Sequence, residues 1–349
     1  MSALQTLFGI NIPLIQAPMA GVQLHGLAAA VSNAGALGSL PCAMLAPAAL
    51  QEELTKLRAA TDQPYNVNFF AHTNPEPDAA REQAWRQALG PYYEEFGIDP
   101  ASIGAGPGRQ PFSAQVADLL EEFKPKVVSF HFGLPAPELM QRVRAWGSRI
   151  IASATTVEEG KWLAERGVDA VIAQGVEAGG HRGIFLSDDL TTQIGTFSLV
   201  PQLARALKVP VIAAGGIADA NGVAAAMALG AAGVQVGTAY MLCPEAITSA
   251  LHRTALKSDR ARHTALTNLF TGRPARGIVN RVMRELGPIS ALAPAFPLAT
   301  SGIAPLRAKA EAAGIDDFTS MWSGQNADGC KEIPAAELTR ELAAGFAAH

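Results

Sequence analysis

The feature that most constrains the fold is a repeated unit of a short apolar segment, a turn of small residues and an Ala-rich amphipathic segment. Continuous apolar runs indicate strands buried on both faces, and their alternation with helices indicates a parallel sheet. We therefore predict an α/β fold, namely a TIM (β/α)8 barrel with a smaller, mainly helical second subdomain. The predicted strands cover 13–17, 65–70, 127–130, 150–154, 170–173, 209–213 and 233–236, and the predicted helices cover 27–33, 137–145, 156–166, 196–207 and 220–229.

Two regions interrupt this repeat and suggest the domain organisation. Residues 72–123 are rich in Pro, Gly and charge, which indicates a helical excursion within a barrel that spans 1–244. Residues 245–310 contain no clear strand, so we expect a helical subdomain over the barrel mouth. The last segment, 311–349, is expected to return to the barrel.

Composition excludes several classes of partner. Apolar residues make up 49% of the chain and charged residues 17%, and the net charge of −4 with no Lys/Arg run argues against nucleic acid. Two uncharged stretches, 26–51 and 220–244, are long enough to span a bilayer. Each changes its hydrophobic pattern midway, which favours a helix–turn–strand unit of a barrel over a membrane span. Three distant cysteines without a CxxC motif suit a reducing cytoplasm and indicate no metal site. We expect a cytoplasmic protein, a monomer or homodimer, with no membrane or nucleic-acid partner.

In such barrels, functional groups collect where the strands end. The first strand runs into the uncharged turn Gln16-Ala-Pro-Met-Ala-Gly21, which lets a flat ring lie close to the backbone. Asn66 and Asn68 interrupt a later strand, and their buried amides need partners such as the pyrimidine of a flavin. A capped turn would account for them equally well.

Two further strand ends suggest a phosphate site. One strand ends in Gly215-Gly216 and the next in Gly237-Thr238, where the seventh and eighth strands should lie. Loops at these positions commonly bind phosphate through backbone N–H groups. A pair of tight turns is the alternative.

The segment 173–183 carries the clearest catalytic signal. Gln174 is expected at the barrel rim, and Gly179 and Gly180 free the backbone next to His181. A histidine there can accept a substrate proton or, as imidazolium, hold an anion. Glu177 and Arg182 could simply pair across this loop.

A second histidine, His131, follows the strand 127–130 and should reach the same mouth. We expect it in the substrate pocket, although a satisfied core histidine is the competing interpretation. The remaining histidines have no comparable setting, and the sequence shows neither a Ser/His/Asp arrangement nor a glycosidase carboxylate pair.

Together these motifs resemble the nitronate monooxygenases, formerly called 2-nitropropane dioxygenases, over nearly the whole chain. The resemblance is carried by the Gln16–Gly21 turn, N-V-N-F-F, S-F-H-F-G-L-P, A-Q-G-x-E-A-G-G-H-R-G, the two phosphate ends and the late F-P-L, P-L-R and M-W-S-G-Q motifs. One departure is Val22-Gln-Leu-His-Gly26, where many relatives carry Thr-Pro.

The resemblance implies bound FMN, no metal, and oxidation of alkyl nitronates by dioxygen to a carbonyl compound and nitrite through a flavin semiquinone. Propionate 3-nitronate is the implied substrate class. His181 matches the catalytic histidine, either as a cationic anchor for the nitronate or as a base for neutral nitroalkanes. The implied cofactor-binding positions are Ala17, Pro18, Met19, Asn68, Gln174, Gly179, Gly180, Gly215, Gly216, Gln235, Val236, Gly237 and Thr238.

Two other functions remain open at this point. An NAD(P)H-dependent flavin reductase, acting on a quinone or an enoyl thioester, would use the same scaffold. A non-catalytic barrel that binds a phosphate ligand would keep the glycine loops, although His181, Gln174 and Asn68 at one mouth argue against it.

Overall fold

The computed structural model describes residues 2–104, 106 and 108–348, and it is built around an eight-stranded parallel barrel. The strand order is β1-β9-β8-β6-β5-β4-β3-β2, and a parallel bridge between Ile15 and Leu37 closes the ring. The predicted fold class is thus confirmed. The barrel strands are β1 (Leu14–Gln16), β2 (Gly38–Pro41), β3 (Tyr65–Phe70), β4 (Val127–His131), β5 (Arg149–Ala154), β6 (Ala170–Gln174), β8 (Val211–Ala214) and β9 (Gly233–Val236).

The barrel strand that sequence analysis missed is β2. Its residues, Gly-Ser-Leu-Pro, have little β-propensity, yet all four are buried. A Cβ on Gly38 would lie 1.9 Å from the carbonyl oxygen of Ala28, so glycine lets the neighbouring helix approach the strand. Tertiary packing, rather than local preference, makes this segment a strand.

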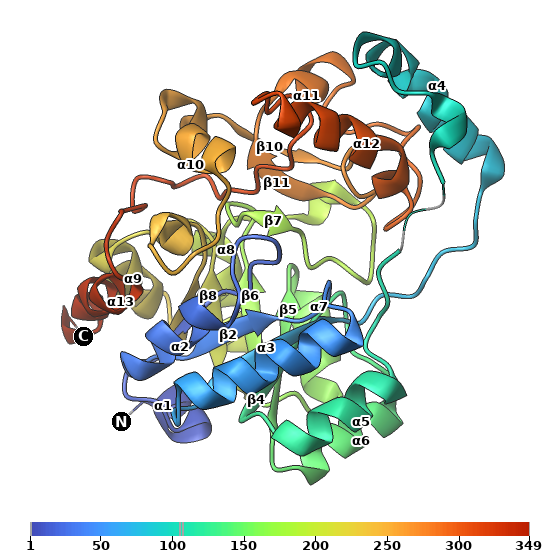
Figure 1. The fold of residues 1–349 in the computed structure, drawn as a ribbon. Helices are drawn as coiled ribbons and strands as arrows, with labels where there is room; N and C mark the ends of the chain where they lie inside the picture. The colour runs from blue at the N-terminus through green and yellow to red at the C-terminus, as the bar shows by residue number, and fades with distance from the viewer. Residues whose placement is uncertain (1, 105, 107, 349) are drawn as a thin grey trace.

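Helices cover the outside of the barrel, and one of them comes from the end of the chain (Figure 1). The helix α13 (Ala335–Ala343) packs on α2 and α9, so the C-terminal tail contacts the first and last helices of the ring. The others are α2 (His25–Asn33), α3 (Pro47–Ala60), α5 (Ala114–Phe123), α6 (Pro137–Ala145), α7 (Val157–Glu165), α8 (Thr196–Ala206) and α9 (Ala220–Ala228).

The end of the barrel at which the strands begin is closed by α1 (Ala3–Phe8). Its Leu4 and Phe8 are fully buried and pack with the inward-facing residues of the strands, including Ile15, Ile172 and Ile212. This apolar plug leaves the opposite end, where the strands terminate, as the open mouth.

A second body lies over that mouth and differs from the prediction. We expected no strand in 245–310, but β10 (Thr264–Thr267) and β11 (Ala275–Ile278) form a small antiparallel sheet there. Its third strand is β7 (Gly180–His181), from the barrel loop. The second body comprises this sheet with α4 (Ala79–Glu95), α10 (Ala250–Leu256), α11 (Arg281–Glu285) and α12 (Ala299–Ala312).

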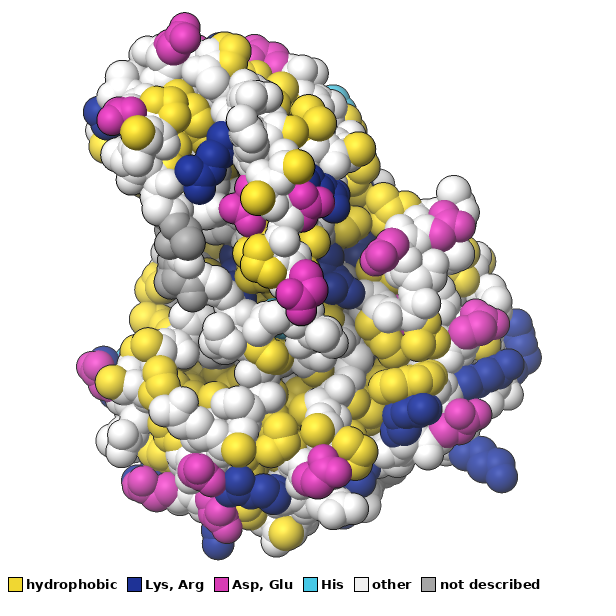
Figure 2. Space-filling view, turned by 90° about the vertical axis from the view of Figure 1, so that its right-hand side faces the viewer, with side chains coloured by type: hydrophobic (Ala, Val, Ile, Leu, Met, Phe, Trp, Pro, Cys, Tyr) yellow, Lys and Arg dark blue, Asp and Glu magenta, His cyan; other side chains and the backbone are white. Residues whose placement is uncertain are grey.

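The excursion at 72–123 also ends earlier than predicted. In this excursion α4 and the short 3-10 turn Pro100–Ser102 lie outside the barrel, and α4 packs on α12 through Trp85 and Leu89. In contrast, α5 packs on α3 and α6 in the outer ring, because its apolar face matches the barrel surface. Figure 2 shows the resulting narrowing between the two bodies, with acidic and basic side chains interspersed on that face. Among the described residues, no helix is long and apolar enough to cross a membrane.

Candidate active site

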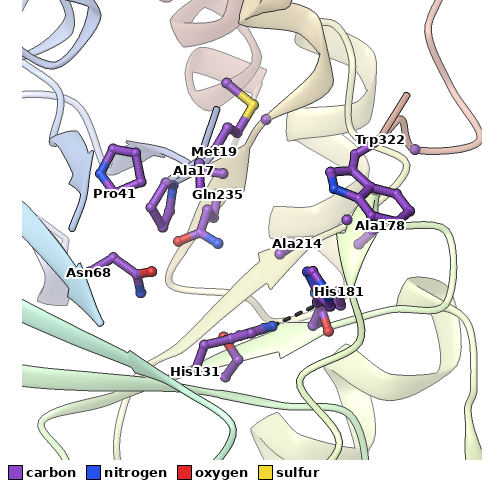
Figure 3. Close-up of a pocket in the computed structure, with 18 of the residues that line it drawn as sticks. Ala17, Met19, Pro41, Asn68, His131, Ala178, His181, Ala214, Gln235 and Trp322 are labelled. Carbon is purple, nitrogen blue, oxygen red and sulfur yellow. Dashed lines mark hydrogen bonds between the residues drawn. The ribbon is translucent and has the colours of Figure 1, made fainter. Parts of the chain in front are cut away.

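A pocket opens at the carboxyl ends of the barrel strands, beneath the small sheet (Figure 3). It contains every predicted site residue except Val236: Ala17, Pro18, Met19, Asn68, His131, Gln174, Gly179, Gly180, His181, Gly215, Gly216, Gln235, Gly237 and Thr238. Because strand side chains alternate, Gln235 and Gly237 face the pocket while Val236 packs outward against the helices. Which of these residues contact a cofactor stays a prediction.

Amide side chains from two strands line one wall of the pocket. Asn68 donates to the Ser129 hydroxyl at 2.9 Å and keeps its oxygen toward the cavity, whereas the Gln235 Oε1 is buried without a partner. Asn66 lies deeper, outside the pocket lining, where it donates to Ser39 and Ser129. A buried acceptor without a partner is costly, so Gln235 suits a ligand that offers an N–H group.

The Gln16–Gly21 turn is held from below by two buried glutamines. Gln23 Oε1 accepts from Gln16 Nε2 at 2.6 Å and from the Met19 backbone N–H at 3.2 Å. The segment Val22–Gly26, where this chain lacks the Thr-Pro of many relatives, thus supplies Gln23, which fixes the turn. The following helix begins without a side-chain cap on Leu24.

The backbone at His181 is fixed by hydrogen bonds to its carbonyl oxygen. Gln174 Nε2 donates to it at 2.9 Å and His131 Nε2 donates at 3.1 Å, while Gln174 Oε1 accepts from Gly183 N–H. His131 Nδ1 then accepts from Ser153 at 3.0 Å. Burial lowers the pKa of His131 to about 4, so it is neutral in this arrangement. His131 therefore both lines the pocket and is satisfied, and the two interpretations do not exclude each other.

Arg182 anchors the same loop to the barrel. Its fully buried guanidinium donates to the carbonyls of Gln174 and Gly175, both at 2.6 Å, and to Gln193 at 2.9 Å. Glu177 instead accepts from Thr196, so the alternative in which Glu177 simply pairs with Arg182 is wrong.

The imidazole of His181 lies among aromatic rings. Phe296 and Trp322 approach it with ring centroids at 5.6 and 5.5 Å, and Nε2 lies 2.9 Å from the Thr271 hydroxyl. Burial, followed by the charge of Arg109 and further by His131 and Arg273, holds the pKa of His181 well below its usual value. The ring is therefore neutral, which favours the base over the cationic anchor.

Sequence analysis missed several residues of this site. Trp322 and Phe70 line the pocket, and Arg109 enters from the segment between α4 and α5. Phe70 ends a predicted strand, so the tendency of functional groups to lie where barrel strands end could have identified it. Arg109 lies in an irregular Gly/Pro-rich segment, where no hydrophobic periodicity indicates which way a side chain points.

The glycine at 179 offers a test of how tightly the mouth is closed. A Cβ there would lie 2.5 Å from the Gly324 backbone nitrogen, whereas a Cβ on Gly90 meets nothing within 4 Å. We expect Gly179→Ala to lower the free energy of unfolding by about 1–3 kcal/mol. Gly90→Ala, inside α4, should raise it by about 0.5–1 kcal/mol. Urea unfolding of both variants checks this, and equal behaviour would contradict the packing argument.

Fold and pocket define a class of enzyme. The pocket combines a flat apolar turn, amides that can face a heterocycle, and two glycine turns, Gly215-Gly216 and Gly237-Thr238, at the seventh and eighth strands. The unpartnered Gln235 oxygen and the positive φ of both Gly215 (110°) and Gly216 (75°) fit a phosphorylated ring ligand. These features are typical of flavin-dependent barrel oxidoreductases.

Comparison with known proteins identifies the family. The profile of the Nitronate monooxygenase family matches residues 1–345, and the chain belongs to this family. A nitronate monooxygenase of Pseudomonas aeruginosa is 44% identical over 345 residues, with 96% of each chain covered. The crystal structure of nitroalkane oxidase from Streptomyces ansochromogenes has a TM-score of 0.90 at 38% identity, covering 99% of this chain and 98% of that one. FabK from Thermotoga maritima has a TM-score of 0.75 at 26% identity, covering 100% and 96%. The protein is thus a flavin-dependent oxidoreductase that acts on small-molecule nitronates.

Proposed function

We propose that the chain binds FMN and oxidises alkyl nitronates with dioxygen to a carbonyl compound and nitrite, with propionate 3-nitronate as the substrate class. The observation that carries the proposal is the neutral His181, fixed by its backbone between Gln174 and His131 and facing a pocket of amides and glycine turns. Three cysteines without disulfides are in keeping with a reaction in the cytoplasm.

The residues present fit FMN. Gln235 and Asn68 would meet the polar edge of the ring, Met19 would pack on its flat face, and the glycine turns would hold the phosphate through backbone N–H groups. When bound, FMN would supply the electron transfer between nitronate and dioxygen. The chain itself binds and orients the substrate and limits the access of water.

The protein's own proton chemistry centres on His181. A nitronate is already an anion and needs no base, whereas a neutral nitroalkane must first lose a proton from carbon. His181 is neutral and its Nδ1 has no hydrogen-bond partner within the described residues, so this nitrogen can accept that proton. Phe70, Phe296 and Trp322 keep water from the ring.

Anaerobic spectroscopy tests the assignment. We expect the purified protein to be yellow, to change its flavin spectrum when mixed with propionate 3-nitronate, and to ignore NADH. Bleaching by NADH alone would instead support the flavin reductase. A colourless protein that stays inactive after incubation with FMN would contradict the cofactor assignment.

A further inference from the structure

One arginine reaches into the pocket without an acidic partner. Arg109 is the only Arg or Lys among the described residues that line the pocket, and none of the described lining residues is Asp or Glu. Its backbone carbonyl accepts from His72 Nε2 at 3.1 Å, and nearby Phe112 N–H donates to the Phe70 carbonyl at 2.8 Å. These bonds tie the segment to the end of β3 and hold Arg109 at the mouth.

The Arg109 guanidinium is charged and lacks a counterion. Its Cζ lies 5.4 Å from the centroid of Phe296, and no carboxylate of the described residues forms an ion pair with it. Burial, and then the charge of Arg307, lowers its pKa to about 10, so it keeps its proton at neutral pH. A half-buried guanidinium without an acidic partner is well suited to bind an anion.

Arg109 and His181 flank the same aromatic ring. The His181 ring centroid is 5.6 Å from that of Phe296, on which Arg109 also packs. Both side chains also line the pocket, so a short molecule bound there can present one end to the imidazole and the other to the guanidinium. Other basic candidates on α12 do not compete, because Arg307 is exposed and paired with Glu311 at 2.8 Å and Lys309 is exposed.

We propose that Arg109 binds a carboxylate at the far end of the substrate, so that the pocket selects nitronates that carry a second anionic group. This inference rests on the proposed function and assigns its substrate specificity to one side chain. The nitronate end lies toward His181, and the carboxylate accepts hydrogen bonds from the guanidinium.

The test compares two nitronates of equal chain length, propionate 3-nitronate and the uncharged-tail propane-1-nitronate. In Arg109→Met, which keeps the apolar stem over Phe296, we expect kcat/KM for the carboxylate substrate to fall by about 10- to 100-fold. For propane-1-nitronate it should change by less than about threefold. Arg109→Lys should be intermediate, and Arg307→Met should match the wild type.

A binding measurement separates this inference from the proposed function. Calorimetric titration with 3-nitropropionate, under anaerobic conditions, should show an affinity about 10-fold or more weaker for Arg109→Met than for the wild type. Equal losses with both nitronates, or an unchanged affinity, would overturn the role of Arg109. If the wild type oxidises neither nitronate, the proposed function fails, and the titration alone decides whether Arg109 binds the carboxylate.

Discussion

In His181→Asn we expect kcat/KM for a neutral nitroalkane to fall by about 10²- to 10⁴-fold, the range for losing a general base. For the corresponding nitronate the loss should be less than about tenfold, because that substrate arrives already deprotonated. The reason lies in the neutral imidazole, whose Nε2 contacts Thr271 while Nδ1 has no hydrogen-bond partner among the described residues. Steady-state oxygen consumption with both substrates measures the difference.

The control for this experiment is His263→Asn, a change at an exposed histidine outside the pocket. It should leave both rates unchanged. Equal losses with nitroalkane and nitronate in His181→Asn would show that the imidazole serves a step common to both, against the base assignment. Flavin content must stay at the wild-type level in both variants for the comparison to hold.

The pH dependence gives a second view of the same group. Because burial and the positive charges of Arg109 and Arg273 lower the pKa of His181, the base form persists below the ordinary histidine value of about 6.5. The acid limb of kcat/KM for nitroalkanes should therefore lie below that pH. Arg109→Met removes one of these charges, so its acid limb should move to higher pH.

The largest effect on stability is expected at Arg182. Its replacement by Met leaves the carbonyls of Gln174 and Gly175 and the Gln193 oxygen without their buried donor. We expect the free energy of unfolding to fall by about 3–5 kcal/mol, together with flavin loss, because the loop that carries His181 loses one of its anchors to the end of β6. Urea unfolding and the flavin-to-protein absorbance ratio measure both effects.

The matched control is Arg262→Met, which removes an exposed arginine paired with exposed Asp259. That change should alter stability by no more than about 0.5 kcal/mol. Arg182→Lys keeps a positive charge but cannot reach three acceptors, so its stability should fall between those of Arg182→Met and the wild type. A wild-type unfolding curve for Arg182→Met would show that the loop is held by other contacts.

Local sequence predicted the parts of the site that local geometry determines. Continuous apolar runs located most barrel strands, and glycine-rich strand ends located the turns around Gly215 and Gly237. It failed where pairing decides structure: β10 and β11 pair with each other, and β11 also pairs with the distant β7. Arg109 escaped prediction because its segment has no regular secondary structure. Val236 is different, since the alternation of strand side chains from Gln235 already directs it outward.

The pairing of β7 with β11 affects how such proteins can be recombined. His181 lies opposite Ala275, and the Arg182 backbone N–H donates to the Pro274 carbonyl at 2.8 Å. His181 thus belongs to both bodies at once. A chimera that took its barrel from this chain and its second body from a relative would pair the loop that carries His181 with a strand from another protein. Exchanges in this family should therefore preserve activity only when residues 174–183 and 271–278 are inherited together.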